Sequence, residues 1–190
     1  MAESKTQIIS KAFVLLGEEQ IQSIDDDNPI HASASAIYDT VMPSILSQRP
    51  WRFALKQFQL NKLTETPIFQ EFSYIYQLPA DLLSIYRFEP LDANVNYKTY
   101  IDKLYSNYSS LKIEYVYQAP ESYFSHNFTL LLIYMMAENI AMNVTNQLSM
   151  AQYFEKKVAE QLSVAASIDA LQVPNDYIMA DDLYTAHVGY

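Results

Sequence analysis

Consecutive carboxylates and dispersed histidines are the groups in this sequence with the most obvious potential for metal chemistry. Asp25, Asp26 and Asp27 could bind a divalent cation. They lack the glycine and the alternating oxygen ligands of a calcium loop, and they equally suit a solvated loop or the start of a helix. The histidines lie in separate segments without ligand spacing, so surface or capping roles are expected for them. They are His31, His126 and His187.

Glu138 is the one carboxylate within the long apolar stretch 128–144. A catalytic carboxylate works with a second acid, base or nucleophile, and the sequence places only the amides Asn139 and Asn143 beside it. We expect a hydrogen-bonded or exposed polar group. The alternative is a small acidic ligand-binding module or a carboxylate-dependent enzyme that uses Asp25, Asp27 or Glu138. Because nucleophile-elbow, phosphate-loop and paired-metal patterns are absent from the sequence, we assign no catalytic residue, no metal ligand and no cofactor.

The overall composition limits the class of protein. The chain has 190 residues, no cysteine, and 22 acidic against 12 basic side chains, which gives a formal net charge of −10. Disulfides and cysteine-metal sites are therefore excluded. The acidic balance argues against a basic footprint for nucleic acid, and solubility is its simplest use. The N-terminus lacks a basic region followed by an apolar run, and 128–144 is short for a bilayer span, so a soluble protein is expected.

The spacing of apolar residues predicts the order of the elements. Helical spacing predicts four helices, over about 4–16, over about 28–48, from Glu121 or Ser122 onward, and from a capping box at 149–152 to about Leu171. Between 54 and about 117 the period changes to two, which predicts strands, with 72–78 and 111–117 the clearest. Residues 94–110 fit either a helix or a strand.

These elements predict an α+β fold class: a four-helix bundle with a small β domain inserted between helices 2 and 3, and an extended C-terminal tail. The expected domains are a helical bundle formed by 1–54 and 119–171, an inserted β-rich domain over 55–118, and a docking tail over 172–190.

Pro50, Trp51 and Phe53 lie where the helical pattern ends and the strand pattern begins. Pro50 has no amide hydrogen and biases Arg49 away from the α region, so a helix should end here. Trp51 is the only tryptophan of the chain. If buried, an indole at this corner would cover on the order of 150–250 Å² and fix the junction between helices and strands. The alternative is an exposed aromatic that stacks on a ligand or a base.

The segment after Leu171 combines turn-forming and acidic residues with a high content of apolar and aromatic side chains. A free disordered tail rarely carries so much apolar area. We expect the segment to dock, either on its own body or on a neighbouring subunit or partner ring. The side chains expected to make that contact are Tyr177, Ile178, Leu183, Tyr184 and Tyr190.

Four short stretches, in order along the chain, carry a resemblance to a known family. They are AFVLLGE at 12–18, followed by Ile21 and SID at 23–25; YD at 38–39; PWRFA at 50–54; and YIYQLPAD at 74–81. In order and spacing, this set resembles the tail tubular protein A family, the head-to-tail adaptors of T7-like, short-tailed bacteriophages. The resemblance covers most of the chain, and the inserted region 94–110 has no counterpart in it.

The resemblance implies a non-enzymatic structural protein of the virion, located at the head-tail junction and in the host cytoplasm during assembly. Family members have a helical bundle with a small β domain inserted between the second and third long helices. They form a dodecameric ring beneath the portal protein ring and join it to the tail nozzle protein, and their C-terminal segment commonly reaches towards the portal. Double-stranded DNA would pass through the lumen without specific binding, and no membrane contact is implied.

Overall fold

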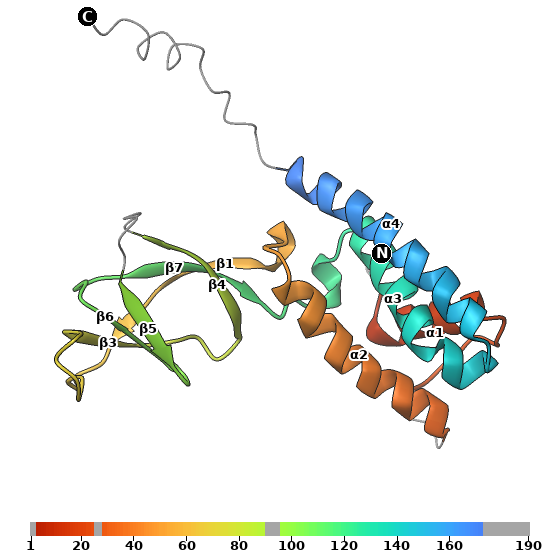
Figure 1. Ribbon diagram of the computed structural model, residues 1–190, viewed down its shortest axis with the longest axis horizontal. Coiled ribbons are helices and arrows are strands. Elements are labelled where there is room, and N and C mark those ends of the chain that lie inside the picture. Colours follow the sequence, from red (N-terminus) through yellow and green to blue (C-terminus); the bar gives the residue numbers. More distant parts are fainter. Residues whose placement is uncertain (1–2, 25–27, 90–95, 173–190) are drawn as a thin grey trace, which may run out of the picture.

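The computed structural model describes residues 3–24, 28–89 and 96–172, and these ranges contain four α-helices and two antiparallel sheets (Figure 1). The helices gather at one end of the molecule and the sheets at the other. The helices are α1 (Lys5–Leu15), α2 (Pro29–Ser47), α3 (His126–Thr145) and α4 (Leu148–Ala170), with short 3₁₀ turns η1 (Arg52–Ala54) and η2 (Glu121–Tyr123). The strands are β1 (Leu55–Gln59), β2 (Asn61–Lys62), β3 (Tyr74–Gln77), β4 (Leu82–Glu89), β5 (Tyr97–Tyr100), β6 (Lys103–Ser106) and β7 (Lys112–Tyr117).

Side-chain caps explain where three of the helices begin. The Ser4 hydroxyl accepts a hydrogen bond from the Gln7 amide, and the Gln7 side chain accepts one from the Ser4 amide, which forms a capping box at α1. Asn28 caps α2 ahead of a proline, and Ser125 caps α3. The starts expected from the sequence for α3 and α4 are wrong. Helix α3 begins after η2 rather than at 121 or 122, and α4 begins at Leu148 without a side-chain cap, ahead of the predicted box at 149–152.

The strands form two antiparallel sheets with the orders β1-β7-β4 and β2-β3-β6-β5. Strand β7 is central in the first sheet, where Ile113 lies opposite Phe58 of β1 and Phe88 of β4. In the second sheet, β5 and β6 form a tight hairpin in which Tyr100 pairs with Lys103. The hairpin resolves the ambiguity of residues 94–110 in favour of strands for the part that the structure describes.

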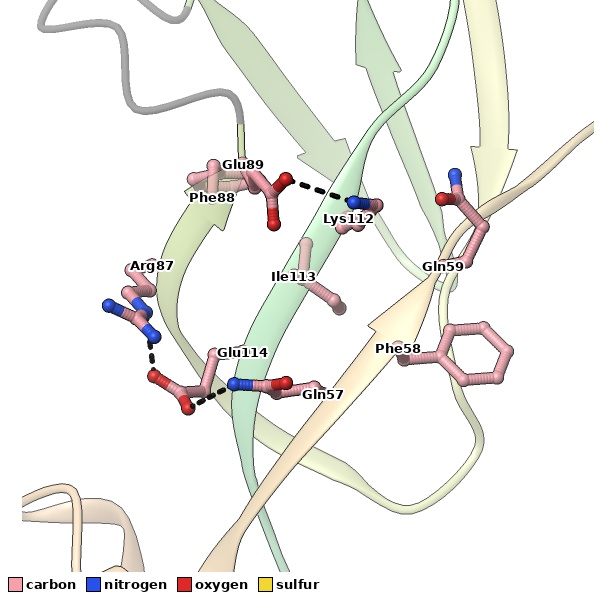
Figure 2. Close-up of a pocket in the computed structure, with 9 residues that line it drawn as sticks. All are labelled: Gln57, Phe58, Gln59, Arg87, Phe88, Glu89, Lys112, Ile113 and Glu114. Atoms are coloured by element: carbon pink, nitrogen blue, oxygen red, sulfur yellow. Dashed lines mark hydrogen bonds and ion pairs between the residues drawn. The ribbon is translucent and has the colours of Figure 1, made fainter.

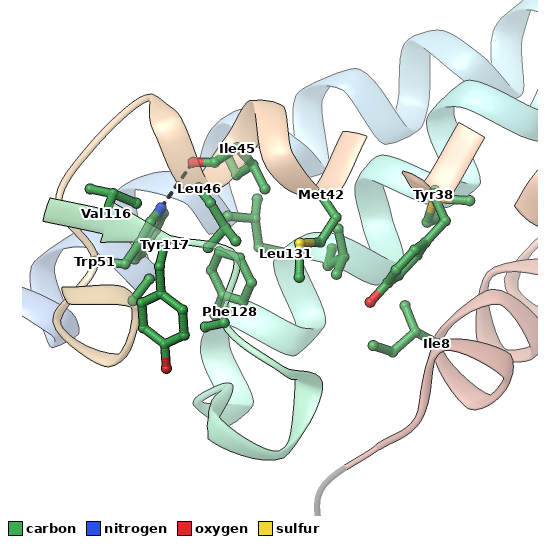
Figure 3. Close-up of a cluster of buried hydrophobic side chains, with 14 of the residues drawn as sticks. Ile8, Tyr38, Met42, Ile45, Leu46, Trp51, Val116, Tyr117, Phe128 and Leu131 are labelled. Atoms are coloured by element: carbon green, nitrogen blue, oxygen red, sulfur yellow. Dashed lines mark hydrogen bonds between the residues drawn. The ribbon is translucent and has the colours of Figure 1, made fainter. Parts of the chain in front are cut away.

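A single apolar core runs from the helices into the sheets. Helix α3 lies at its centre and packs against α1, α2 and α4, while α2 also packs on β4 and β7. Val116 and Tyr117, at the end of β7, are buried in the same cluster as Leu46, Trp51 and Phe128 (Figure 3). Helix α3 is also the one described helix that is long and apolar enough to span a membrane, and half of the window concerned is buried within the protein.

The predicted four-helix bundle with a small inserted β domain is wrong. The described residues form four helices and two antiparallel sheets of seven strands, with about 49% helix and 20% strand, and the helices are split by the strands. Two contacts explain the difference. Helix α4 packs mainly on α3, and α2 packs on two strands, so the strands share the helical core. The expected domain limits stay a prediction, and the tail beyond Gln172 lies outside the described residues.

Candidate functional site

The junction between helices and strands is built around Trp51 (Figure 3). The indole is only 1% exposed, and its Nε1–H donates to the backbone oxygen of Ile45 at 3.0 Å. The Phe128 ring lies edge-on with its centroid 4.9 Å from that of Trp51, and Phe53 lies 6.1 Å away on the same cluster. Pro50 sits between α2 and η1, directly before Trp51. In the structure the indole therefore belongs to the core and is not available for stacking on a ligand.

The residues on either side of Trp51 hold the last turn of α4. Both carboxylate oxygens of Asp169 accept from the Arg52 amide, at 3.1 and 3.3 Å, and Asp169 is buried. The Arg49 guanidinium lies over the Trp51 ring, 4.7 Å from its centroid, and donates to the Ala166 backbone oxygen at 3.3 Å. The end of α4, where the C-terminal segment begins, is thereby fastened to the helix-strand junction. No pattern in the sequence indicates this contact.

Burial raises the pKa of the Asp169 carboxyl above its usual value, and the Arg52 amide and the charges of Arg49 and Arg52 offset this only in part. The folded state therefore binds the proton more tightly than the unfolded chain. The stabilisation that comes from this bound proton is fully present below the unfolded pKa of about 3.9. It is lost as the pH rises through the raised pKa of Asp169 in the folded state. At neutral pH the protein thus carries a buried charge at some cost in stability.

Asp169→Asn is expected to unfold at the same or a higher urea concentration than the unaltered chain at pH 7, because it keeps an oxygen acceptor for the Arg52 amide without the buried charge. Asp169→Ala, which leaves that amide unpaired, should lose about 1–3 kcal/mol. In urea titrations at pH 7 and pH 4, the free energy of unfolding of the unaltered chain should rise relative to that of Asp169→Asn as the pH falls. Equal losses for the two variants would contradict this assignment.

The YIYQLPAD stretch holds parts of both sheets in place. The Gln77 side-chain amide donates to the backbone oxygen of Asp102 at 3.0 Å, and the Leu78 amide donates to the same oxygen at 2.9 Å. Asp81 pairs with Lys56 at 2.7 Å and accepts from the Tyr115 hydroxyl at 2.9 Å. The Lys56 hydrogen bond lowers the pKa of Asp81, while burial and Asp81 raise that of Tyr115 to about 12.

The YD pair joins α2 to its neighbours. The Tyr38 hydroxyl donates to the Glu121 carboxylate of η2 at 2.9 Å, and Asp39 pairs with Lys5 of α1 at 2.7 Å. Burial, with the Glu121 charge, strongly raises the pKa of Tyr38. Residues from separate stretches of the resemblance thus make contacts between elements that are distant in sequence.

The groups considered for catalysis or metal binding are dispersed where the structure describes them. His31 packs edge-on against Phe13 with ring centroids 5.5 Å apart, and His126 opens α3. Burial raises the pKa of Glu138, and the nearby Glu155 adds to this effect. Within residues 3–24, 28–89 and 96–172, no group of three or more His, Asp or Glu side chains could hold a metal ion. The aspartates 25–27 and His187 lie outside the described residues.

A hollow of about 320 Å³ lies on the face of the β1-β7-β4 sheet (Figure 2). Glu114, on the central strand β7, accepts from the Gln57 side-chain amide at 3.2 Å and pairs with Arg87 at 2.7 Å. Lys112 pairs with Glu89 at 2.9 Å. Because the four charged side chains that line this hollow neutralise one another in pairs, the arrangement is that of a solvated sheet face rather than a charged ligand site.

Several large apolar side chains are exposed, and sequence reasoning missed two of the places where they occur. One is the turn between β5 and β6 with the loop before β3, where Ile68, Phe69 and Ile101 stand in solvent. The other is the end of α4, where Leu171 is 80% exposed. The sequence feature that could have indicated these exposed side chains is the presence of apolar residues at turn positions. The expected partner contacts of the tail, which are Tyr177, Ile178, Leu183, Tyr184 and Tyr190, lie outside the described residues.

Comparison with models of known protein families and with curated proteins finds no match to this chain. The site is therefore interpreted from its own residues. They form a fastened junction, with exposed apolar side chains at the end of α4, at the β5–β6 turn and on the loop before β3.

Proposed function

We propose that this protein is a structural head-to-tail adaptor of a tailed bacteriophage. It assembles as a ring between the portal protein ring and the tail nozzle protein, and double-stranded DNA passes through its lumen. The observation that carries this proposal is the placement of the stretches that resemble the tail tubular protein A family. PWRFA (50–54) holds the last turn of α4, and YIYQLPAD (74–81) holds the β5–β6 turn. An adaptor needs such contacts to keep its binding surfaces in fixed relation.

The exposed apolar side chains support the same function. Contiguous exposed apolar side chains on a soluble protein mark places where other proteins bind. Here exposed apolar side chains occur at the end of α4, beside the helix-strand junction, and on the loops of the sheet end (Figure 1). The placement suits a protein that contacts one ring through the segment after α4 and another through its sheets.

The acidic balance suits a lumen that passes DNA without holding it. A net charge of −10 repels phosphates, so DNA would slide rather than bind. Reversing the charge of Asp or Glu side chains on the lumen should then slow DNA ejection from assembled virions. Unchanged ejection kinetics would remove this part of the proposal.

Mixing the purified chain with the portal ring of the same virus tests the function. We expect co-sedimentation of the chain with the ring, and no binding to a portal whose tail-facing surface is already occupied. A chain that ignores the portal at every salt concentration tried would refute the adaptor function.

The raised pKa of Glu138 beside Glu155 is the observation that favours a small acidic ligand-binding module or enzyme instead. Thermal unfolding with divalent cations, nucleotides and sugars separates the two functions. An adaptor should show no ligand-dependent rise in the unfolding temperature, whereas a specific ligand would raise it by several degrees.

A further inference from the structure

Ile101 is displayed in an unusual way. It is the first residue of a two-residue turn between β5 and β6, it is fully exposed, and its φ is +58°. This left-handed region suits glycine or asparagine, and a β-branched residue rarely adopts it. A chain that optimised this turn for stability alone would carry glycine there. The exposed apolar side chain is kept at the expense of backbone strain.

The surrounding structure holds the turn in this conformation. The backbone oxygen of Asp102 accepts from the Gln77 side chain at 3.0 Å and from the Leu78 amide at 2.9 Å. A second bond, at 3.1 Å, joins the Gln77 side chain to the Asp102 carboxylate. Strained backbone that its neighbours fix so firmly is typical of functional positions.

Other exposed apolar side chains come from the same hairpin and from the loop before β3. The preceding residue, Tyr100, lines a hollow of about 180 Å³ together with Ile68 and Phe69 of the loop before β3. Ile68 is 92% exposed and Phe69 is 78% exposed. We name these four side chains, Ile68, Phe69, Tyr100 and Ile101, the loop patch.

Ion pairs lie beside the loop patch. Lys103 pairs with Glu65 at 2.6 Å, and Lys98 pairs with Glu71 at 2.7 Å. Both pairs join the loop before β3 to the β5–β6 hairpin, so they hold the two parts of the loop patch together. Apolar anchors with a polar, solvent-exposed rim are the arrangement found in protein-protein interfaces.

We propose that the loop patch is an anchor that inserts into an apolar socket on the next ring of the tail, which the proposed function identifies as the nozzle protein. The loop patch lies on the sheet end, away from the α4 terminus that leads to the C-terminal segment (Figure 1). This assignment rests on the proposed adaptor function. It adds which surface of the chain meets the nozzle side and which side chain leads the contact.

The size and charge of the loop patch favour a multi-copy protein partner. Its four side chains expose on the order of 500 Å², which is less than the roughly 800 Å² per partner of a stable one-to-one interface. Repetition around a ring would supply the missing affinity by avidity. The adjacent charges balance and the chain carries −10 overall, so an anionic lipid surface would repel it.

The test compares the unaltered chain with Ile101→Gly and Ile101→Asn. Both replacements accept the left-handed conformation, so both should be at least as stable as the unaltered chain in urea unfolding. Both should weaken binding of the portal-bound adaptor to the purified nozzle protein by about tenfold or more. Leu148→Ser, which removes another exposed apolar side chain far from the loop patch, is the matched control and should bind normally.

Several outcomes would overturn the inference while leaving the adaptor function intact. One such outcome is that both Ile101 variants bind the portal and the portal-bound variants still bind the nozzle protein normally. A loss of self-association without a loss of nozzle binding would assign the loop patch to a second copy. Binding of the unaltered chain, but not the variants, to phosphatidylglycerol vesicles would assign it to lipid. Failure of the unaltered chain to bind the portal would instead refute the adaptor function itself.

Discussion

Trp51→Ala is expected to lower the free energy of unfolding by about 3–5 kcal/mol, enough to remove much of the stability of a domain of this size. The indole is 1% exposed and contacts Phe53 and Phe128. Its removal leaves a cavity at the point where the core passes from helices to strands. It also leaves the Ile45 oxygen without its donor.

Two comparisons make the Trp51 prediction specific. Trp51→Phe fills most of the volume of the indole, so it should lose less stability than the alanine variant. Because phenylalanine cannot donate to the Ile45 oxygen, some loss should remain. Phe69→Ala removes an aromatic ring that is 78% exposed and should change stability by less than about 0.5 kcal/mol. Urea unfolding followed by tryptophan-independent far-ultraviolet circular dichroism measures all three. A loss below about 1 kcal/mol for Trp51→Ala would refute the anchor role.

Deleting residues 172–190 is expected to leave folding intact and to abolish docking on the portal. The deletion keeps Asp169, whose bonds to the Arg52 amide fasten the end of α4. It removes the apolar and aromatic side chains expected to make partner contact, which are Tyr177, Ile178, Leu183, Tyr184 and Tyr190. A docking segment that loses its anchor side chains loses its affinity for the partner.

A substituted chain separates the tail's apolar contacts from its length. Replacing the five anchor side chains with serine keeps the length and should abolish portal binding as fully as the deletion. Urea unfolding of both variants should match that of the unaltered chain. If the deletion unfolds the protein, the segment belongs to the protein's own core, which is the other possibility that the sequence left open.

The starts of α1 and α2 could be predicted because their signals are local. Ser4 and Asn28 cap helices at the expected places, since a cap depends on the next two or three residues. The same logic failed at the predicted box over 149–152, because α4 already begins at Leu148, close behind the end of α3. A proline inside a helical pattern usually kinks or ends the helix, but α2 continues past Pro43 to Ser47.

The arrangement of the elements could not be read from the sequence, because it depends on contacts between distant segments. Burial alternates along β7 as expected up to Tyr115, but Val116 and Tyr117 are both buried where the strand enters the helical core. Period-two patterns describe a sheet with one solvated face and give no sign of such a junction. This is why the strands were wrongly expected to form a separate insert.

In the candidate site, too, local signals could be predicted and contacts between distant segments could not. Trp51 stood out because it is unique and follows a proline at a change of period. Asp169 did not, because its partner is an amide 117 residues earlier in the chain. Ile101 did not, because a left-handed backbone angle at an isoleucine contradicts the residue's own preference.

The copy number of this protein on the portal ring is the measurement that tests the adaptor function most directly. Native mass spectrometry of the mixed and purified complex would give it, with the chain lacking residues 172–190 as the negative control. The adaptor function predicts one fixed number of copies, matched to the symmetry of the portal ring and lost in the deletion variant. A continuous spread of copy numbers, or equal binding by the deletion variant, would contradict it.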